Sequence, residues 1–137
     1  MFGLFGKSRE QKKENEKKKR DEDWRNEQYF DAQEILVAGM RSSDGSRMAK
    51  GVKQMTALME RYPDFPKPFV SMTAFSIRAR RLNMAAALCD ICESRFKNEE
   101  DVRSEINEWR AAIKEYADES VDKDEDFGTW VYKFSNE

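Results

Sequence analysis

Two groups of residues in this chain have types and spacings that could carry chemistry. Cys89 and Cys92 have the spacing of half a zinc site or of a redox pair. Asp122, Asp124 and Asp126 alternate as do the first oxygen ligands of a calcium-binding loop. The chain has no histidine, which removes the commonest general base and the commonest zinc ligand. The question is therefore whether either group is complete.

The cysteine pair lacks a second pair of metal ligands and lies inside a helical pattern. Redox cysteines of the thioredoxin type stand instead at a helix N-terminus after a strand. A disulfide between side chains three residues apart on one helix would strain the backbone. We therefore expect Cys89 and Cys92 to be reduced, buried and inert, and to face Met55 and Leu58 in the core.

The aspartate triplet departs from a calcium loop directly after its third member. Phe127 occupies the place of the glycine that makes the sharp turn, and Gly128 comes one residue late. Lys133 stands where the bidentate glutamate is needed. We interpret residues 118–126 as a solvated acidic linker, and expect neither a metal site nor a cofactor.

The composition indicates a single domain with a polar exterior. The chain has 137 residues, of which 38% are charged and 39% are apolar. Its 25 basic and 27 acidic side chains give a net charge of -2, which argues against nucleic-acid binding through the overall field. No apolar run approaches the roughly 20 residues that span a bilayer, and the N-terminus lacks the order of a secretory signal. These features predict a cytoplasmic protein.

The N-terminal segment, residues 1–23, is apolar at its start and basic from residue 7 to residue 20. The apolar side chains at the start, those of Phe2, Leu4 and Phe5, could insert into a membrane interface while the lysines attract anionic lipid head groups. The basic run is diluted by acids, and no aromatic residues are interleaved with it for stacking on nucleic-acid bases. We favour a frayed terminus or a solvated helix over peripheral membrane contact or nucleic-acid binding.

Residues 24–117, which must position any functional site, show helical periodicity. Prolines occur only at 63, 66 and 68, so most of this range is free of helix breakers. Apolar residues at spacings of three and four predict five helices. Their expected ranges are 24–42, 46–62, 68–81, 83–97 and 100–117. The fold class is therefore all-α, with two antiparallel helical hairpins plus a fifth helix. Residues 118–137 form the acidic linker and an aromatic tail, FGTWVYKF, that suits a strand or a segment folded back.

A shift of 34 residues superposes the chain on itself, with apolar residues matching apolar ones. The pairs are Ile35 with Phe69, Met55 with Cys89, Leu58 with Cys92 and Tyr62 with Phe96. This period is that of tetratricopeptide repeats, and residues 32–117 resemble that family. Pattern positions of the first unit are occupied by Ile35, Ala38, Gly39, Gly51, Met55 and Pro63.

Several features of this resemblance bear on the packing. Gly39 and Gly51 would let two antiparallel helices approach closely. Ser42 stands where a tyrosine is usual, and Lys97 stands where a closing proline is usual. A third unit has only its first helix. A small helical bundle unrelated to the family is the alternative.

The resemblance implies that the first helix of each unit lines a concave groove. The residues that would face a ligand there are Lys67, Val70, Ala74, Ile77 and Arg78, continued by Asp101, Ser104 and Glu108. We expect Phe69, Met72 and Phe75 to be buried behind them, because they project from another side of the same helix. The lysine and asparagine with which family members clamp a C-terminal carboxylate are absent from Val70 and Ala74. The arginines that end this helix could also simply complement the helix dipole.

We therefore hypothesise a non-catalytic protein-binding module, an adaptor, chaperone or inhibitor, that presents a helical groove to a protein or peptide. The alternative is a small regulatory or immunity-type protein that covers a partner with its charged surface. An enzyme is the third and least favoured hypothesis. The oligomeric state is left open.

Overall fold

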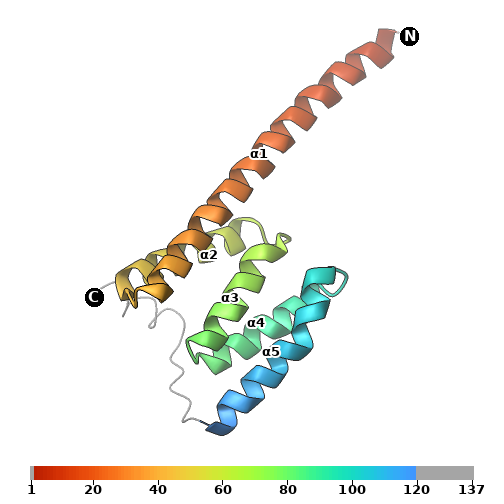
Figure 1. The fold of residues 1–137 in the computed structure, drawn as a ribbon. Coiled ribbons are helices and arrows are strands. Elements are labelled where there is room, and N and C mark those ends of the chain that lie inside the picture. The colour runs from red at the N-terminus through yellow and green to blue at the C-terminus, as the bar shows by residue number, and fades with distance from the viewer. Residues whose placement is uncertain (1, 120–137) are drawn as a thin grey trace.

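The computed structural model describes residues 2–119, with side chains from residue 10 to residue 118, and this part of the chain contains five helices and no strand (Figure 1). The helices are α1 (Phe2–Arg41), α2 (Gly45–Arg61), α3 (Pro66–Arg78), α4 (Leu82–Arg95) and α5 (Glu100–Glu119). The all-α prediction is confirmed. The aspartate triplet and the aromatic tail lie outside the described residues.

α1 is one helix of 40 residues whose first half projects away from the other four helices (Figure 1). Residues 2–23 are therefore helical, and the side chains of residues 10–24 are exposed. Helix-favouring Glu, Lys, Gln and Arg residues dominate this stretch, and charges such as Glu14 and Lys18 stand four positions apart. The first buried apolar side chains of α1 are those of Ala32 and Leu36.

Two aromatic residues of α1 are exposed. Trp24 is 40% exposed and Phe30 is 61% exposed. The guanidinium carbon of Arg61 lies 4.5 Å from the Trp24 ring centroid, so this ring makes a surface cation–π contact with α2.

The hairpin of α1 and α2 depends on two glycines. A Cβ atom on Gly39 would lie 2.8 Å from the backbone nitrogen of Met48, and one on Gly51 would lie 3.0 Å from the Cα atom of Leu36. The close approach predicted for these positions is confirmed. Between the helices, the Asp44 side chain accepts a hydrogen bond from the backbone N–H of Arg47 and so caps α2.

The core is built from all five helices. α3 packs against α1 and α2 on one side and against α4 and α5 on the other. Buried members of the cluster include Leu36, Val52, Met55, Leu58, Phe69, Met72, Phe75, Leu88, Cys89, Cys92, Val102 and Trp109. The burial predicted for the core face of α3 is thereby confirmed.

Both cysteines are buried and unpaired, as predicted, in the same cluster as Met55 and Leu58. The Thr73 hydroxyl donates a hydrogen bond to the carbonyl oxygen of Phe69 at 2.7 Å, and its oxygen lies 3.8 Å from the Cys92 sulfur. Burial raises the pKa of both thiols, which keeps them protonated at neutral pH. Such thiols are poor nucleophiles.

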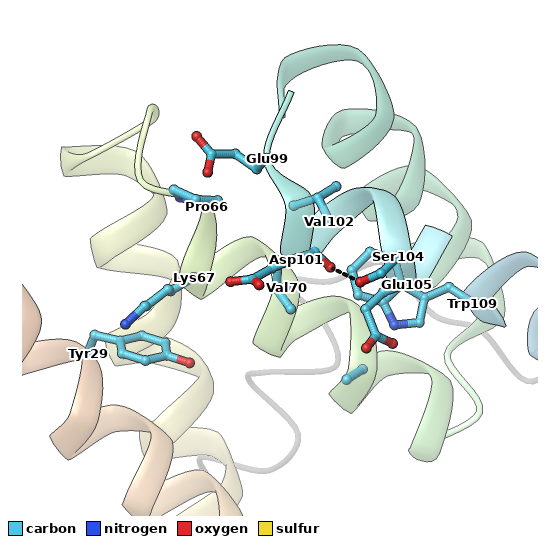
Figure 2. Close-up of a pocket in the computed structure, with 11 residues that line it drawn as sticks. Tyr29, Pro66, Lys67, Val70, Glu99, Asp101, Val102, Ser104, Glu105 and Trp109 are labelled. Atoms are coloured by element: carbon cyan, nitrogen blue, oxygen red, sulfur yellow. Dashed lines mark hydrogen bonds between the residues drawn. The ribbon is translucent and has the colours of Figure 1, made fainter. Parts of the chain in front are cut away.

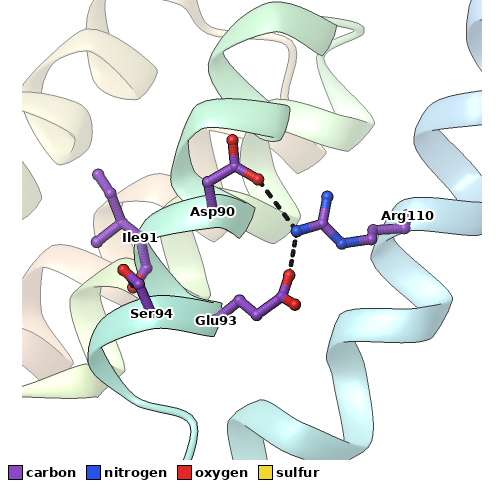
Figure 3. A network of polar contacts seen from close by, with 5 residues as sticks. All are labelled: Asp90, Ile91, Glu93, Ser94 and Arg110. Carbon is purple, nitrogen blue, oxygen red and sulfur yellow. Dashed lines mark hydrogen bonds and ion pairs between the residues drawn. The ribbon is translucent and has the colours of Figure 1, made fainter.

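α5 closes the domain against α4 and the end of α3. The Arg110 guanidinium bridges Asp90, at 3.0 Å, and Glu93, both on α4 (Figure 3). These two hydrogen bonds raise the pKa of Arg110. All three side chains are exposed, so the pairs contribute at most about 1 kcal/mol each, and the buried apolar side chains hold α5 in place. Near the C-terminal end of α5, the Arg80 guanidinium carbon lies 3.4 Å from the centroid of the Tyr116 ring.

Candidate functional site

A groove with a volume of about 410 Å³ runs between α1, α3 and α5 (Figure 2). α2 and α4, the second helices of the two hairpins, contribute nothing to its lining. The lining residues are Tyr29 of α1, Pro66, Lys67, Val70 and Ala74 of α3, Glu99 just before α5, and Asp101, Val102, Ser104, Glu105 and Trp109 in the first half of α5. The first helix of each hairpin and the fifth helix therefore share one surface.

The floor of the groove is apolar. Val70 and Ala74 stand three and seven positions after Lys67, so helical periodicity places all three on one face of α3. The side chains of Val70 and Ala74 are partly exposed, while Val102 and Trp109 of α5 are buried beneath the groove. Apolar ligand groups would find their contacts here.

The wall on the α1 side carries one positive charge, that of Lys67 of α3, and the aromatic ring of Tyr29. The Tyr29 hydroxyl forms a hydrogen bond of 2.7 Å with the hydroxyl of Ser71, which fixes its ring at the edge of α3. The Lys67 ammonium lies 5.8 Å from the Tyr29 ring centroid and 5.4 Å from that of Phe30. Lys67 is thus turned toward α1 (Figure 2).

The opposite wall, on α5, is acidic. Asp101 and Glu105 stand four positions apart on one face of the helix, and Glu99 precedes its first turn. The Ser104 hydroxyl donates to the carbonyl oxygen of Asp101 at 3.1 Å. Figure 2 shows the carboxylates of Asp101 and Glu105 beside the groove. The ion pairs found within residues 10–118 involve Asp44, Asp90 and Glu93, and none of these wall carboxylates.

Five of the residues proposed from the sequence come together in this groove. They are Lys67, Val70, Ala74, Asp101 and Ser104. Arg78 and Glu108 are exposed but lie outside the lining. The prediction that Ile77 is exposed is wrong, because this side chain is 7% exposed and belongs to the core cluster. It shares a helix face with Val70, but it lies at the end of α3, where the contact between Arg80 and Tyr116 brings α5 close.

Sequence reasoning missed several lining residues. Glu105 follows Asp101 by four positions, and this spacing alone could have identified it. Tyr29 and Trp109 look like ordinary core residues in a helical pattern, so no local signal separates them from the core. Glu99 lies in the loop before α5, where helical periodicity makes no prediction.

The described part of the chain offers little else for chemistry. No group of three or more His, Cys, Asp or Glu side chains in that part could hold a metal ion. None of the helices between residues 2 and 119 is long and apolar enough to cross a membrane.

Comparison with protein-family models found no match, and searches for similar curated proteins and similar solved structures found none. The site must therefore be interpreted from its own geometry.

Proposed function

We propose that this chain is a non-catalytic, cytoplasmic protein-binding module of tetratricopeptide-like architecture, and that the groove between α1, α3 and α5 receives an extended segment of a partner protein. One observation carries the proposal: helices far apart in sequence contribute to a single groove that combines an apolar floor with polar edges. Helical-repeat proteins use such shared concave surfaces for binding. Such a groove would suit an adaptor, a chaperone or an inhibitor.

The chemistry of the lining supports binding rather than catalysis. The groove contains no thiol, and the chain contains no imidazole. Its two hydroxyl groups, on Tyr29 and Ser104, hydrogen-bond to Ser71 and to the Asp101 backbone. Neither of these two hydrogen bonds joins the hydroxyl to a side chain that could act as the general base that a nucleophile requires. The two buried, unpaired cysteines support a location in the reducing cytoplasm.

Site-specific photocrosslinking tests the proposal. A photoreactive amino acid at Ser104 would stand in the groove, and the same amino acid at Asn107 would be equally exposed on α5 but outside the groove. We expect a discrete crosslinked partner from position 104 and none from position 107. Addition of Ser104→Trp protein, whose groove is filled, should not compete for that partner. Crosslinking of equal strength from both positions would overturn the proposal.

A second candidate function is binding through the projecting half of α1. Exposed bases on this arm include Lys12, Lys13, Lys17, Lys18, Lys19 and Arg20. This arrangement supports a small regulatory or immunity-type protein that covers an acidic partner. A Lys17→Glu/Lys18→Glu variant distinguishes the two functions. Loss of the partner with the groove intact favours the arm, and retention favours the groove.

A further inference from the structure

The groove carries unequal charge on its two walls. Three carboxylates, Glu99, Asp101 and Glu105, face one ammonium group, that of Lys67. Lys67 is engaged by the rings of Tyr29 and Phe30 on the far wall. Even if it swings across to one carboxylate, two negative charges remain without a partner in the groove.

We propose that the groove selects a peptide in which an arginine or lysine stands next to a small apolar residue. The cationic side chain binds Asp101 and Glu105, and its neighbour packs on Val70 and Ala74. This inference rests on the proposed function, and it adds the chemistry of the ligand.

The helix dipole of α5 accounts for only one of the two acidic side chains, Asp101 and Glu105, that this helix places in the groove wall. Acidic side chains in the first turn of a helix are stabilised by the helix dipole, which explains Asp101. The effect falls off within that turn and does not explain Glu105, which lies beyond it. Glu105 is also partly buried, so its charge is less screened by solvent than that of a fully exposed carboxylate. No cation within the described residues pairs with it. A cation supplied by the ligand would satisfy it.

The apolar floor adds a size limit to this charge preference. Val70 offers a small, partly exposed side chain directly beside the acidic wall (Figure 2), and Ala74, also partly exposed, lines the same groove. Val102 and Trp109 close the space underneath. The groove volume of about 410 Å³ has to hold the cationic side chain as well. The residue that follows or precedes the cation must therefore be small, such as alanine, valine or proline.

The test uses a random dodecapeptide library displayed on phage and selected on the full-length protein. Enriched peptides are then synthesised with a fluorescent label, and their binding is measured by anisotropy. Four proteins are compared: wild type, Asp101→Asn/Glu105→Gln, the groove-filled variant Ser104→Trp, and the control Glu27→Gln/Glu115→Gln. The control removes two exposed charges outside the groove, so the net charge changes equally in both double variants. Circular dichroism checks that each variant is folded.

We expect the enriched peptides to contain arginine or lysine beside a small apolar residue. Their affinity for Asp101→Asn/Glu105→Gln should be lower than for wild type by a factor of about ten or more, whereas their affinity for the control variant should equal that for wild type. Two results would overturn this inference and leave the proposed function standing. The enriched peptides could bind wild type but not Ser104→Trp and yet lack a basic residue, or they could bind both double variants with equal affinity. Failure to select any peptide, or selection of peptides that bind Ser104→Trp as tightly as wild type, would overturn both.

Discussion

Leu58 and Cys92 hold the same position at the ends of α2 and α4. The carbonyl oxygen of Leu58 accepts a hydrogen bond from the backbone N–H of Tyr62 at 2.8 Å, and that of Cys92 accepts one from Phe96 at 2.9 Å. Both side chains are buried, at 5% and 0% exposure. The next hydrogen bond in each loop also repeats, since the carbonyl oxygens of Tyr62 and Phe96 each accept from the residue three positions later. The burial predicted for these two residues is thus confirmed, and the 34-residue repeat itself stays a prediction.

Replacement of Leu58 by aspartate should strongly destabilise the domain. The change puts an unpaired carboxylate into the core, which costs about 3–5 kcal/mol, a large part of the stability of a typical domain. Urea denaturation followed by circular dichroism would measure the loss. Ala57→Asp is the matched control, because residue 57 is exposed and its substitution should stay within about 0.5 kcal/mol of wild type. Equal midpoints for the two variants would show that Leu58 is not a core residue.

Gly51→Ala should destabilise the hairpin of α1 and α2, although alanine is normally the better helix former. In an open helix the change would gain about 1 kcal/mol. Here the new Cβ would lie 3.0 Å from the Leu36 Cα atom, so the two backbones must separate, and we expect a net loss of about 1–3 kcal/mol. Ser46→Ala, at an exposed position of α2, serves as the control and should be neutral or slightly stabilising. A raised melting temperature for Gly51→Ala would contradict the close approach.

The helices could be predicted from the sequence because each has its own apolar periodicity, but their ends depend on backbone conformations that periodicity does not report. α3 was expected to run to residue 81 and ends at Arg78, because Arg80 adopts a left-handed conformation with φ 61°. The 34-residue repetition holds where α2 and α4 end, at Arg61 and Arg95. At the turn inside each hairpin the equivalent positions are three residues further apart. The left-handed residues of these turns are Ser43 and Arg80.

The candidate site was predicted in outline through the family resemblance rather than from local chemistry. That resemblance placed Val70, Ala74 and Asp101 on facing helices, and the structure brings them together. It could not show that Ile77 is covered, because the packing of α5 against the end of α3 is a long-range contact. Nor could it identify Tyr29, whose role depends on where α1 crosses α3.

Ser43→Gly should stabilise the protein. Ser43 follows α1 in the left-handed region with φ 54°, which costs an L-residue about 1 kcal/mol and costs glycine nothing. We expect a gain of up to about 1 kcal/mol, measured as a rise in the urea midpoint. Arg80→Gly relieves the same conformation but removes the guanidinium from the Tyr116 ring, so its net gain should be smaller. A loss of stability in Ser43→Gly would mean that its hydroxyl matters more than its backbone.

The two buried cysteines should make the protein less stable at alkaline pH. Burial raises the pKa of both thiols above 9.0, so above that pH the unfolded chain releases protons that the folded chain retains. Stability should therefore be unaffected by these groups below pH 9.0 and should fall as the pH rises beyond it. Urea midpoints at about pH 8 and about pH 10 would measure the fall.

The variant Cys89→Ala/Cys92→Ala is the control for this pH dependence. It should be less stable than wild type at both pH values because it leaves cavities in the core, but its midpoint should change less between them. Tyr62, whose pKa burial also raises, is present in both proteins and contributes equally to their remaining slope. In the folded wild type, a thiol reagent should react slowly at neutral pH and rapidly once urea is added, since the thiols are buried and protonated. An identical pH dependence in the two proteins, or fast labelling without urea, would show that Cys89 and Cys92 are open to solvent.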